Sequence, residues 1–377
     1  MRKRKIIHVV EDLNIGGLER VVQCIVQGLD RERYDVAVWC LARGGMIADE
    51  LRRAGFPVEV LGLRSYHNPR NVWVLARLMR RGGFHVVHTH GYFAGTFGRL
   101  AAAIARVPLV VHHVHTTYSF LAPRHHRIER ALSFVTDRII CVANAVRENL
   151  STVVGIRGEK LCVIYNASPV EQDRCASAAV DASRAAMGIK PGDFVITTVA
   201  SISDNKGQAV LLEAFRGIAA VHSASRLVFV GDGPRRQALE KQARDFGLAS
   251  RVLFTGVLTN VRPVLQLTDV LVLPTTEREG LSVALVEGLS AGIPLIGSRL
   301  GGIPEVVDDG VNGFLVEPSH ARELGRALES LLSNPALRIR MGEAGRAIYD
   351  RKFNRIRMMA QIQEIYGGQR ERREHAG

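Results

Sequence analysis

The sequence predicts an α/β protein made of two doubly wound domains, each with helices on both faces of a parallel sheet. Short apolar, β-branched runs alternate along the chain with stretches of helical periodicity, which is the pattern of repeated βαβ units. A polar, alanine-rich stretch at about residues 167–191 interrupts this alternation, which then begins again. The chain of 377 residues is also long enough for two domains of ordinary size.

Each strand of the first half is predicted from a short apolar run, because buried parallel strands are apolar on both faces. These strands are expected at residues 6–10, 36–40, 58–61, 85–89, 109–113 and 138–142. A helix is expected after the loop at 11–17, with one apolar face formed by Leu18, Val22, Ile25, Val26 and Leu29.

The second half repeats this pattern, with strands expected at residues 194–200, 227–230, 252–255, 270–273 and 294–297. A last helical stretch, at about 335–366, is long enough to run back across to the first domain, and a loose polar tail follows from Gly367. The expected divisions are a first domain at 1–168, a linker at 169–190, a second domain at 191–345, and a crossover helix with the tail at 346–377.

The composition excludes general disorder, because 47% of the residues are hydrophobic and 23% are charged. The net charge of +13 is concentrated in residues 1–168, where 24 Lys and Arg stand against 13 Asp and Glu. This asymmetry favours an anionic partner for the first half, and nucleic acid, a phosphate-bearing substrate or an anionic membrane surface would each fit. Solvated charge in an arginine-rich protein explains the same excess without a partner.

Cysteine usage and the N-terminus indicate a cytosolic protein. The five cysteines, an odd number without a Cys-x-x-Cys pair, are expected to be reduced thiols: Cys24, Cys40, Cys141, Cys162 and Cys175. The basic residues 1–5 are typical of a signal peptide, but the apolar segment that follows them ends at Glu11 and is too short. No run of about eighteen apolar residues occurs, so we expect a soluble protein that is at most peripheral to a membrane.

A short helix is predicted over residues 283–291, directly after the strand at 270–273. Ser282 is a suitable N-cap, and Gly292 with Pro294 just beyond is a suitable C-terminal stop. The free N–H groups at the start of such a helix lie at the carboxyl end of a parallel strand, where open α/β sheets bind ligands and phosphate is favoured. The sequence therefore predicts an anion site at this helix start.

Two carboxylates flank the predicted anion site. Glu279 lies in the loop before it, and Glu287 lies five residues past the cap, roughly 7–8 Å along the helix. One carboxylate can contact hydroxyls on one side of a diphosphate while the other reaches the far side, as the sugar and ribose of a nucleotide sugar require. Taken alone, two glutamates at this spacing are also common on solvated helices.

The whole C-terminal half resembles the retaining glycosyltransferases of family four. The matching segments occur in order: Val199–Gly207, Leu227-Val-Phe-Val-Gly-Asp-Gly-Pro-Arg235, Arg251-Val-Leu-Phe-Thr-Gly256, Thr268-Asp-Val-Leu-Val-Leu-Pro274, Glu279–Glu287, Ala291-Gly-Ile-Pro294, Gly301-Gly-Ile-Pro-Glu305 and Asn312-Gly-Phe-Leu-Val-Glu-Pro318. The first half is similar more loosely, through Ile15-Gly-Gly-Leu-Glu19, His88-Thr-His-Gly91, His115-Thr-Thr117, Ala145-Val-Arg-Glu-Asn149 and Val163-Ile-Tyr-Asn166. This resemblance implies the GT-B fold, in which two Rossmann-like domains face a cleft and a C-terminal helix crosses back to the first domain.

The resemblance also implies roles for individual residues. Lys206 would bind the donor phosphates and stabilise the departing diphosphate, Glu279 would contact the sugar hydroxyls, and Glu287 would contact the ribose. His115 would lie near the donor sugar and the reacting centre, so His115, Lys206 and Glu279 are the expected catalytic residues. The further expected donor-binding residues are Gly16, Gly17, Ser201, Gly280, Leu281, Ser282, Val283 and Glu287. Without the resemblance, Lys206 could be a surface lysine and Gly16-Gly17 an ordinary βα turn.

One departure from the family pattern concerns the donor phosphates. Many members carry Arg five residues before the lysine, in Gly-Arg-Leu, whereas this chain has Ala200-Ser201-Ile202. Ser201 can hydrogen-bond a phosphate but cannot neutralise it. Either another arginine substitutes, or the diphosphate is held less tightly.

Histidine pairs invite a metal interpretation, because His88 and His90 could share one strand face, as could His113 and His115. No Cys or carboxylate set completes a ligand group at normal spacing, and no Asp-x-Asp triplet suggests a metal that bridges a diphosphate. We therefore expect no metal. The absence of Gly-x-Gly-x-x-Gly also argues against a dinucleotide oxidoreductase.

A basic amphipathic helix is expected at residues 71–81. Its apolar residues Trp73, Leu75 and Leu78 lie among four arginines, Arg70, Arg77, Arg80 and Arg81. Such a helix can rest on anionic lipid, or it can turn an apolar stripe to the core and expose a solvated basic face.

The expected function is transfer of a sugar from a nucleoside-diphosphate sugar to a hydroxyl of a glycan or lipid-linked acceptor, with retention and without cofactor or metal. Such an enzyme would serve cell-surface polysaccharide or glycolipid synthesis in the cytoplasm, at most peripheral to the inner membrane face, with no nucleic-acid partner. Two alternatives are an epimerase of the same fold and a non-catalytic protein that binds nucleotide sugar.

Overall fold

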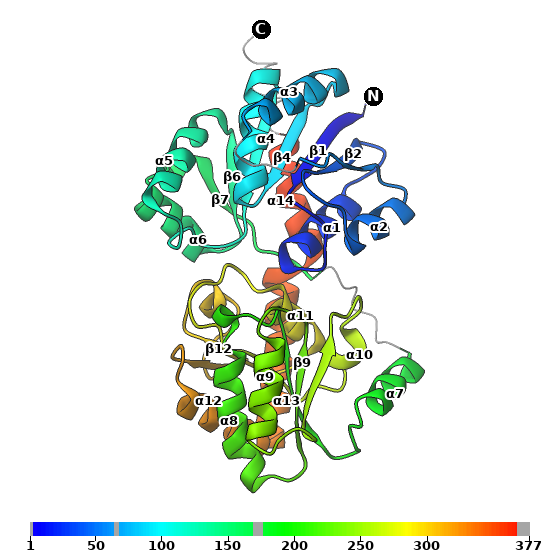
Figure 1. The fold of residues 1–377 in the computed structure, drawn as a ribbon, viewed down its shortest axis with the longest axis vertical. Coiled ribbons are helices and arrows are strands. Elements are labelled where there is room, and N and C mark those ends of the chain that lie inside the picture. The colour runs from blue at the N-terminus through cyan, green and yellow to red at the C-terminus, as the bar shows by residue number, and fades with distance from the viewer. Residues whose placement is uncertain (1–2, 64–67, 169–175, 368–377) are drawn as a thin grey trace. The chain divides into compact units, whose positions relative to one another are not determined.

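The computed structural model describes residues 3–63, 68–168 and 176–367, which form two compact units (Figure 1). The first unit comprises Met1–Pro169 and Asn354–Gly377, and the second comprises Val170–Phe353. Each unit contains one parallel sheet with helices on both faces, as predicted. Cys175 and the predicted tail after Gly367 lie outside the described residues.

In the described part of the first unit, seven parallel strands form a sheet of order β3-β2-β1-β4-β5-β6-β7. The strands are β1 (Arg4–Val10), β2 (Tyr34–Cys40), β3 (Val58–Val60), β4 (Val86–His90), β5 (Leu109–Val114), β6 (Arg138–Cys141) and β7 (Leu161–Val163). The helices are α1 (Gly17–Gly28), α2 (Met46–Arg53), α3 (Arg70–Gly82), α4 (Tyr92–Ala105), α5 (Pro123–Leu132), α6 (Asn144–Asn149) and α14 (Arg355–Gly367). The strand order reverses between β1 and β4, which places a topological switch point at their carboxyl ends.

Six parallel strands, again counted over described residues, form the sheet of the second unit in the order β10-β9-β8-β11-β12-β13. They are β8 (Phe194–Val199), β9 (Ser225–Val230), β10 (Val252–Gly256), β11 (Val270–Leu273), β12 (Leu295–Ser298) and β13 (Gly313–Val316). The helices are α7 (Ser177–Ala186), α8 (Gln208–Val221), α9 (Arg236–Asp245), α10 (Arg262–Leu265), α11 (Val283–Ala291), α12 (Ala321–Leu332) and α13 (Pro335–Ile348). The switch point lies between β8 and β11.

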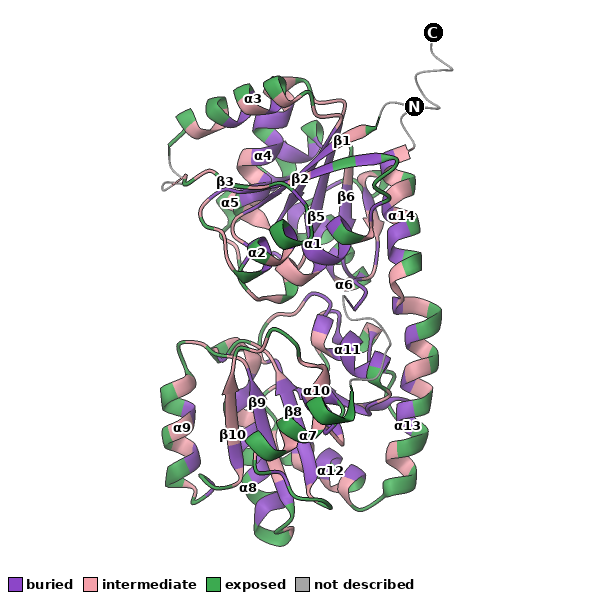
Figure 2. Ribbon diagram, turned by 90° about the vertical axis from the view of Figure 1, so that its right-hand side faces the viewer, coloured by how far each residue is buried: buried purple, intermediate pink, exposed green. Residues whose placement is uncertain are grey.

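Apolar burial on both faces explains why the strands read as continuous apolar runs. In Figure 2 buried residues run along the strands of each sheet. In the first unit, Ile7, Val9 and Val87 pack against residues of α3 and α4 such as Leu75 and Ala101. Alternation along the strands turns the intervening residues to the opposite face.

The strand predictions are confirmed, but two short edge strands, β7 and β13, were not predicted. Each has only three or four residues and a neighbour on one side only, so its apolar pattern is too brief to stand out.

The predicted linker and the predicted last helix differ from the structure. Residues 169–175 lie outside the described residues, and the rest of the predicted linker contains α7, which belongs to the second unit. The predicted helix at 335–366 is divided into α13, a π-helical turn (Tyr349–Phe353) and α14. The division occurs because the Asn354 side chain accepts a hydrogen bond from the Arg357 N–H (2.9 Å) and so caps a new helix. Within α14, Met358 and Tyr366 are buried in the first unit.

Candidate donor site and active-site residues

The helix predicted over residues 283–291 is confirmed as α11. The Ser282 hydroxyl accepts a hydrogen bond from the Leu285 N–H (3.3 Å), and Gly292 ends the helix in the left-handed conformation (φ 70°). The helix follows β11 at the switch point of the second sheet. Since α-helical geometry leaves the first N–H groups without acceptors inside the helix, this end is suited to an anion.

An ion pair joins the loops that follow β8 and β11. Lys206 Nζ lies 2.6 Å from Glu279 Oε2, and Thr275 Oγ1 donates to the same carboxylate oxygen (3.3 Å). The two charged side chains are only 21% and 13% exposed. Lys206 is therefore a positioned cation beside the start of α11 and not a free surface lysine.

Two glycines allow the backbones around this ion pair to approach each other. Gly207 has φ +69°, and a Cβ there would overlap the Pro274 carbonyl oxygen. Gly301 has φ +55°, and a Cβ there would overlap the Glu279 carbonyl oxygen. Both positions require glycine for conformation as well as for space.

The other predicted donor residues of the second unit line the same segment. Gly280, Leu281, Ser282 and Val283 are all buried. Glu287 is also buried, with 8% of its surface exposed, although it carries a carboxylate. Glu287 thus adds a buried carboxylate to α11, beyond the helix start.

Ser201 is exposed, and a neighbouring arginine missed by the sequence analysis lies close to its loop. The Arg235 N–H donates to the Ile202 carbonyl (3.2 Å), and Arg235 Nε donates to Asp204 Oδ1 (2.6 Å). Its side chain is 56% exposed. Arg235 is the last residue of the Leu227–Arg235 motif. Its place in that motif is the sequence feature that could have indicated its proximity to residues 201–206.

The predicted residues of the first unit lie at the carboxyl ends of β1 and β5. Gly17 begins α1, and Gly16 precedes it in extended conformation. A Cβ on Gly16 would overlap Glu19 Oε2, so the Glu19 side chain folds back over the loop. Burial raises the pKa of Glu19 to about 7. The sequence analysis did not single out Glu19 as a titratable group, although the Ile15–Glu19 motif contains it.

His115 follows β5 directly and contacts another histidine. His115 Nε2 lies 3.2 Å from His90 Nδ1, and desolvation lowers the pKa of His115 to about 3, so this imidazole is neutral near pH 7. His112 is buried on the opposite face of the strand, with Nδ1 2.9 Å from Thr89 Oγ1.

A cavity of about 710 Å³ in the second unit does not coincide with these residues. Asp193, Asp269 and Arg338 line it at the amino-terminal edge of the sheet, whereas Lys206 and Glu279 lie at the carboxyl edge. Three of its charged side chains are paired: Arg338 Nε lies 3.8 Å from Asp269 Oδ1, and Asp193 pairs with Arg226 outside the cavity (2.9 Å). We regard this cavity as structural.

Cys24, Cys40, Cys141 and Cys162 are free thiols. Among the helices that the structure describes, none has the length and apolar character needed to cross a membrane.

Comparison with known protein families covers both units. Residues 180–348 match the family described as Glycosyl transferases group 1, and residues 15–172 match Glycosyltransferase Family 4. The chain therefore belongs to the glycosyltransferases of this type, and the family predicted from the motifs is confirmed. Lys206, Glu279 and Glu287 lie within the first of these matches.

Individual relatives match nearly the whole length of the chain. The chain is 27% identical, over 97% of both proteins, to the UDP-Gal:alpha-D-GlcNAc-diphosphoundecaprenol alpha-1,3-galactosyltransferase of Escherichia coli. The fold of the present chain matches that of Anabaena HepE in complex with UDP and glucose. The TM-score is 0.86 over 96% of this chain and 98% of that chain, at 23% identity. WaaG, a glycosyltransferase involved in lipopolysaccharide biosynthesis, has a TM-score of 0.76 at 16% identity over 96% of this chain and all of that chain. The fold is thus GT-B.

Proposed function

We propose that this protein transfers a sugar from a nucleoside-diphosphate sugar to a hydroxyl group, with retention of anomeric configuration. The observation that carries the proposal is the Lys206–Glu279 pair beside the start of α11 (2.6 Å). Lys206 and the N–H groups at the start of α11 are suited to bind a diphosphate. The Glu279 carboxylate is suited to accept hydrogen bonds from sugar hydroxyls.

The chemistry follows from the charge that develops on the diphosphate. As the bond between the anomeric carbon and the diphosphate oxygen breaks, Lys206 and the α11 N-terminus stabilise the negative charge on the leaving oxygen. The acceptor oxygen then bonds to the same face of the anomeric carbon, and its proton passes to that leaving oxygen. Glu279 orients the sugar and Glu287 the ribose, and no protein nucleophile is assigned.

We expect the diphosphate to be bound without Mg²⁺ or Mn²⁺ and the reaction to need no cofactor. Fixed protein charges perform the neutralisation that a metal performs in other transferases. Full activity without added Mg²⁺ or Mn²⁺ is expected, and dependence on either ion would contradict this assignment.

The acceptor is proposed to be a glycan or lipid-linked sugar at the cytoplasmic face of the membrane. Support comes from the Escherichia coli relative, whose named acceptor is a diphosphoundecaprenol-linked sugar. The positive charge of residues 1–168 suits an acceptor that carries a diphosphate, and nucleic acid is not required to explain it.

A donor panel tests the proposed function. The protein is incubated with UDP-, GDP-, ADP- and dTDP-linked sugars, and both thermal stabilisation and release of free nucleotide are measured. One donor class should stabilise the protein and release nucleotide, and a transferred product should keep the anomeric configuration. Stabilisation without turnover across glycan and lipid-linked acceptors would favour a non-catalytic binding protein, and a new sugar nucleotide formed without acceptor would favour an epimerase.

Replacing Glu287 tests the ribose contact. Glu287→Ala should weaken nucleotide binding by about tenfold, because a charge-assisted hydrogen bond is lost. Calorimetric titration with the nucleoside diphosphate measures it. The exposed neighbour Glu277 provides the matched control, since Glu277→Ala should bind normally. Unchanged affinity in Glu287→Ala, with the variant folded, would contradict the assignment.

Arg235 is proposed to supply the charge that Ser201 lacks. Its backbone is fixed to Ile202 and its guanidinium lies beside Asp204, in the loop that carries Lys206. Arg235→Ala should therefore raise the Kd for the nucleoside diphosphate about tenfold. The double variant Arg235→Ala/Ser201→Arg should regain affinity, because it restores the family's usual arginine.

Arg236→Ala is the control for Arg235, because Arg236 pairs with Asp232 in the loop before α9 and with Glu240 on α9. If Arg235→Ala and Arg236→Ala bind the nucleotide equally well, Arg235 is not a phosphate ligand.

Peripheral membrane contact is proposed to involve α3. Leu75 and Met79 are buried, which fits the core-facing interpretation, but Trp73 is 65% exposed and Val74 is 48% exposed. The four arginines, Arg70, Arg77, Arg80 and Arg81, are exposed as well. Exposed tryptophan among arginines is the combination that binds an anionic lipid interface.

Vesicle sedimentation tests this contact. The protein should bind vesicles that contain anionic phospholipid in a salt-sensitive manner, and Trp73→Ala should lose most of that binding. The exposed Ile339 of α13 supplies a control, Ile339→Ala, that should bind normally. Equal binding by both variants, or binding that is insensitive to salt, would contradict the proposal.

A further inference from the structure

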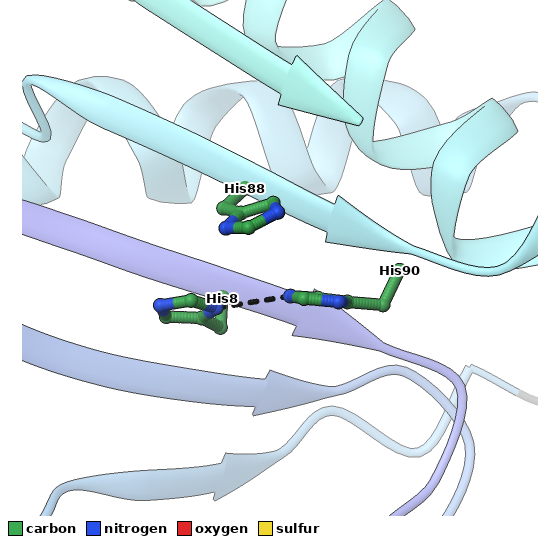
Figure 3. Close-up of side chains that lie close together, drawn as sticks. All are labelled: His8, His88 and His90. Atoms are coloured by element: carbon green, nitrogen blue, oxygen red, sulfur yellow. Dashed lines mark hydrogen bonds between the residues drawn. The ribbon is translucent and has the colours of Figure 1, made fainter. Parts of the chain in front are cut away.

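Five histidines gather on one face of the sheet of the first unit. His8 lies on β1, His88 and His90 on β4, His113 on β5, and His115 directly after β5. His8 is in register with His88, and His90 with His113. Because residues two apart on a strand share a face, this register brings the side chains of neighbouring strands together. Figure 3 shows His8, His88 and His90 side by side.

The imidazole rings are in mutual contact. His8 Nδ1 lies 3.0 Å from His90 Nε2, which is the contact drawn in Figure 3, and His90 Nδ1 lies 3.2 Å from His115 Nε2. His88 Nδ1 lies 2.6 Å from the Tyr366 hydroxyl of α14. Ring centroids are 4.3 Å apart for His88 and His90.

Many ring nitrogens of this cluster lack a hydrogen-bond partner. Within the part of the chain that the structure describes, the buried and unpartnered nitrogens are His8 Nε2, His88 Nε2, both nitrogens of His113, and His115 Nδ1. Leaving a buried polar atom without a partner is costly, and buried polar groups are normally paired. A ligand bound to His88 Nε2 would satisfy one of these atoms.

The imidazoles are in the form that binds metal. Burial lowers the pKa of His8 to about 3 and lowers the pKa of His88 and His90 well below the usual value. All three are therefore neutral at physiological pH, and neutral imidazole is the metal-binding form.

We propose that His8, His88 and His90 bind a transition-metal dication of the class that favours imidazole, with Zn²⁺ as the reference ion. One nitrogen from each residue lies within 4.8 Å of the others. Tetrahedral zinc with Zn–N bonds of about 2.0–2.1 Å places its nitrogens about 3.3 Å apart. The His8–His90 distance of 3.0 Å is already close to this value.

Neighbouring groups orient two of the three ligands. If His88 Nδ1–H donates to Tyr366 and His90 Nδ1–H donates to His115, both Nε2 atoms carry lone pairs. The ion would then replace the hydrogen bond between His8 Nδ1 and His90 Nε2, with the His8 proton on Nε2. Metal-binding histidines usually have such a partner on the other nitrogen, and that partner fixes the tautomer. His90, His113 and His115 form a second set of close imidazoles that shares His90.

The prediction of no metal rested on spacing along the chain and considered each histidine pair separately. The third ligand, His8, is 80 residues before His88 and joins the pair only through the β1–β4 register. An ion there would fasten β1 and β4 and hold Tyr366 of α14 beside them. The site contacts His115, one of the expected catalytic residues, through His90. Retention of Zn²⁺ is measured without donor or acceptor, so that test does not depend on the proposed function.

Metal analysis of the tag-free, full-length protein tests the site. Protein stripped with chelator is incubated with Zn²⁺, desalted and analysed by mass spectrometry for bound metal, and Co²⁺ binding is followed by visible absorption. One equivalent of Zn²⁺ should be retained, and Co²⁺ should give a tetrahedral spectrum. His88→Gln and His90→Gln should each weaken binding by about tenfold or more.

Two further variants keep the test decisive if ligand variants fold poorly. Tyr366→Phe removes only a hydroxyl and should weaken Zn²⁺ binding by about tenfold through the loss of the outer partner. His112→Gln replaces an equally buried histidine on the opposite face and should retain the metal. Failure of folded wild-type protein to retain Zn²⁺ or Co²⁺, or equal binding by His112→Gln, Tyr366→Phe and a folded His88→Gln, would overturn the proposal and leave a hydrogen-bonded histidine cluster.

Discussion

The ion pair between Lys206 and Glu279 is the interaction on which the candidate donor site depends. It joins the loops after β8 and β11 at the point where the strand order of the second sheet reverses. With side chains only 21% and 13% exposed, each charge needs the other as its partner in the absence of ligand. A diphosphate would provide Lys206 with a new anion, and sugar hydroxyls would provide Glu279 with new donors. Binding would therefore exchange one set of charged contacts for another.

Sheet architecture explains why the candidate site residues lie at the carboxyl ends of strands, or in the loops and helices that follow them, in both units. The faces of each parallel sheet are covered by helices, so the carboxyl ends of the strands and the loops after them are the places left for polar groups. In the second unit, Gly207 and Gly301 let these loops meet at backbone distance. In the first unit, His8, His88 and His90 also extend polar side chains from the strands into a buried face. Such a polar patch inside a sheet requires satisfied partners.

The sequence was sufficient to predict the two sheets, the α11 helix with its cap, and the family, because these depend on local patterns and ordered motifs. Short edge strands such as β13 lack enough residues for a pattern. The cap at Asn354 divides the last helix. The sequence did not indicate it, because the helical pattern of residues 335–366 continues through this position. Arg235 and His8 depend on contacts between segments distant in sequence, and no spacing along the chain reveals that Arg235 lies beside Ile202 or His8 beside His90.

The most direct test of the account compares nucleotide binding by the wild type and Lys206→Gln. Calorimetry would measure the Kd of the nucleoside diphosphate selected by the donor panel and of the matching monophosphate, with thermal unfolding as a check on folding. Lys206 is assigned to the leaving oxygen, which belongs to the phosphate that is bonded to the sugar. The nucleoside monophosphate lacks this phosphate. Lys206→Gln should therefore weaken diphosphate binding by about 10- to 100-fold and leave monophosphate binding nearly unchanged. Equal affinity of both proteins for the diphosphate, or an equal loss for the two nucleotides, would contradict the assignment.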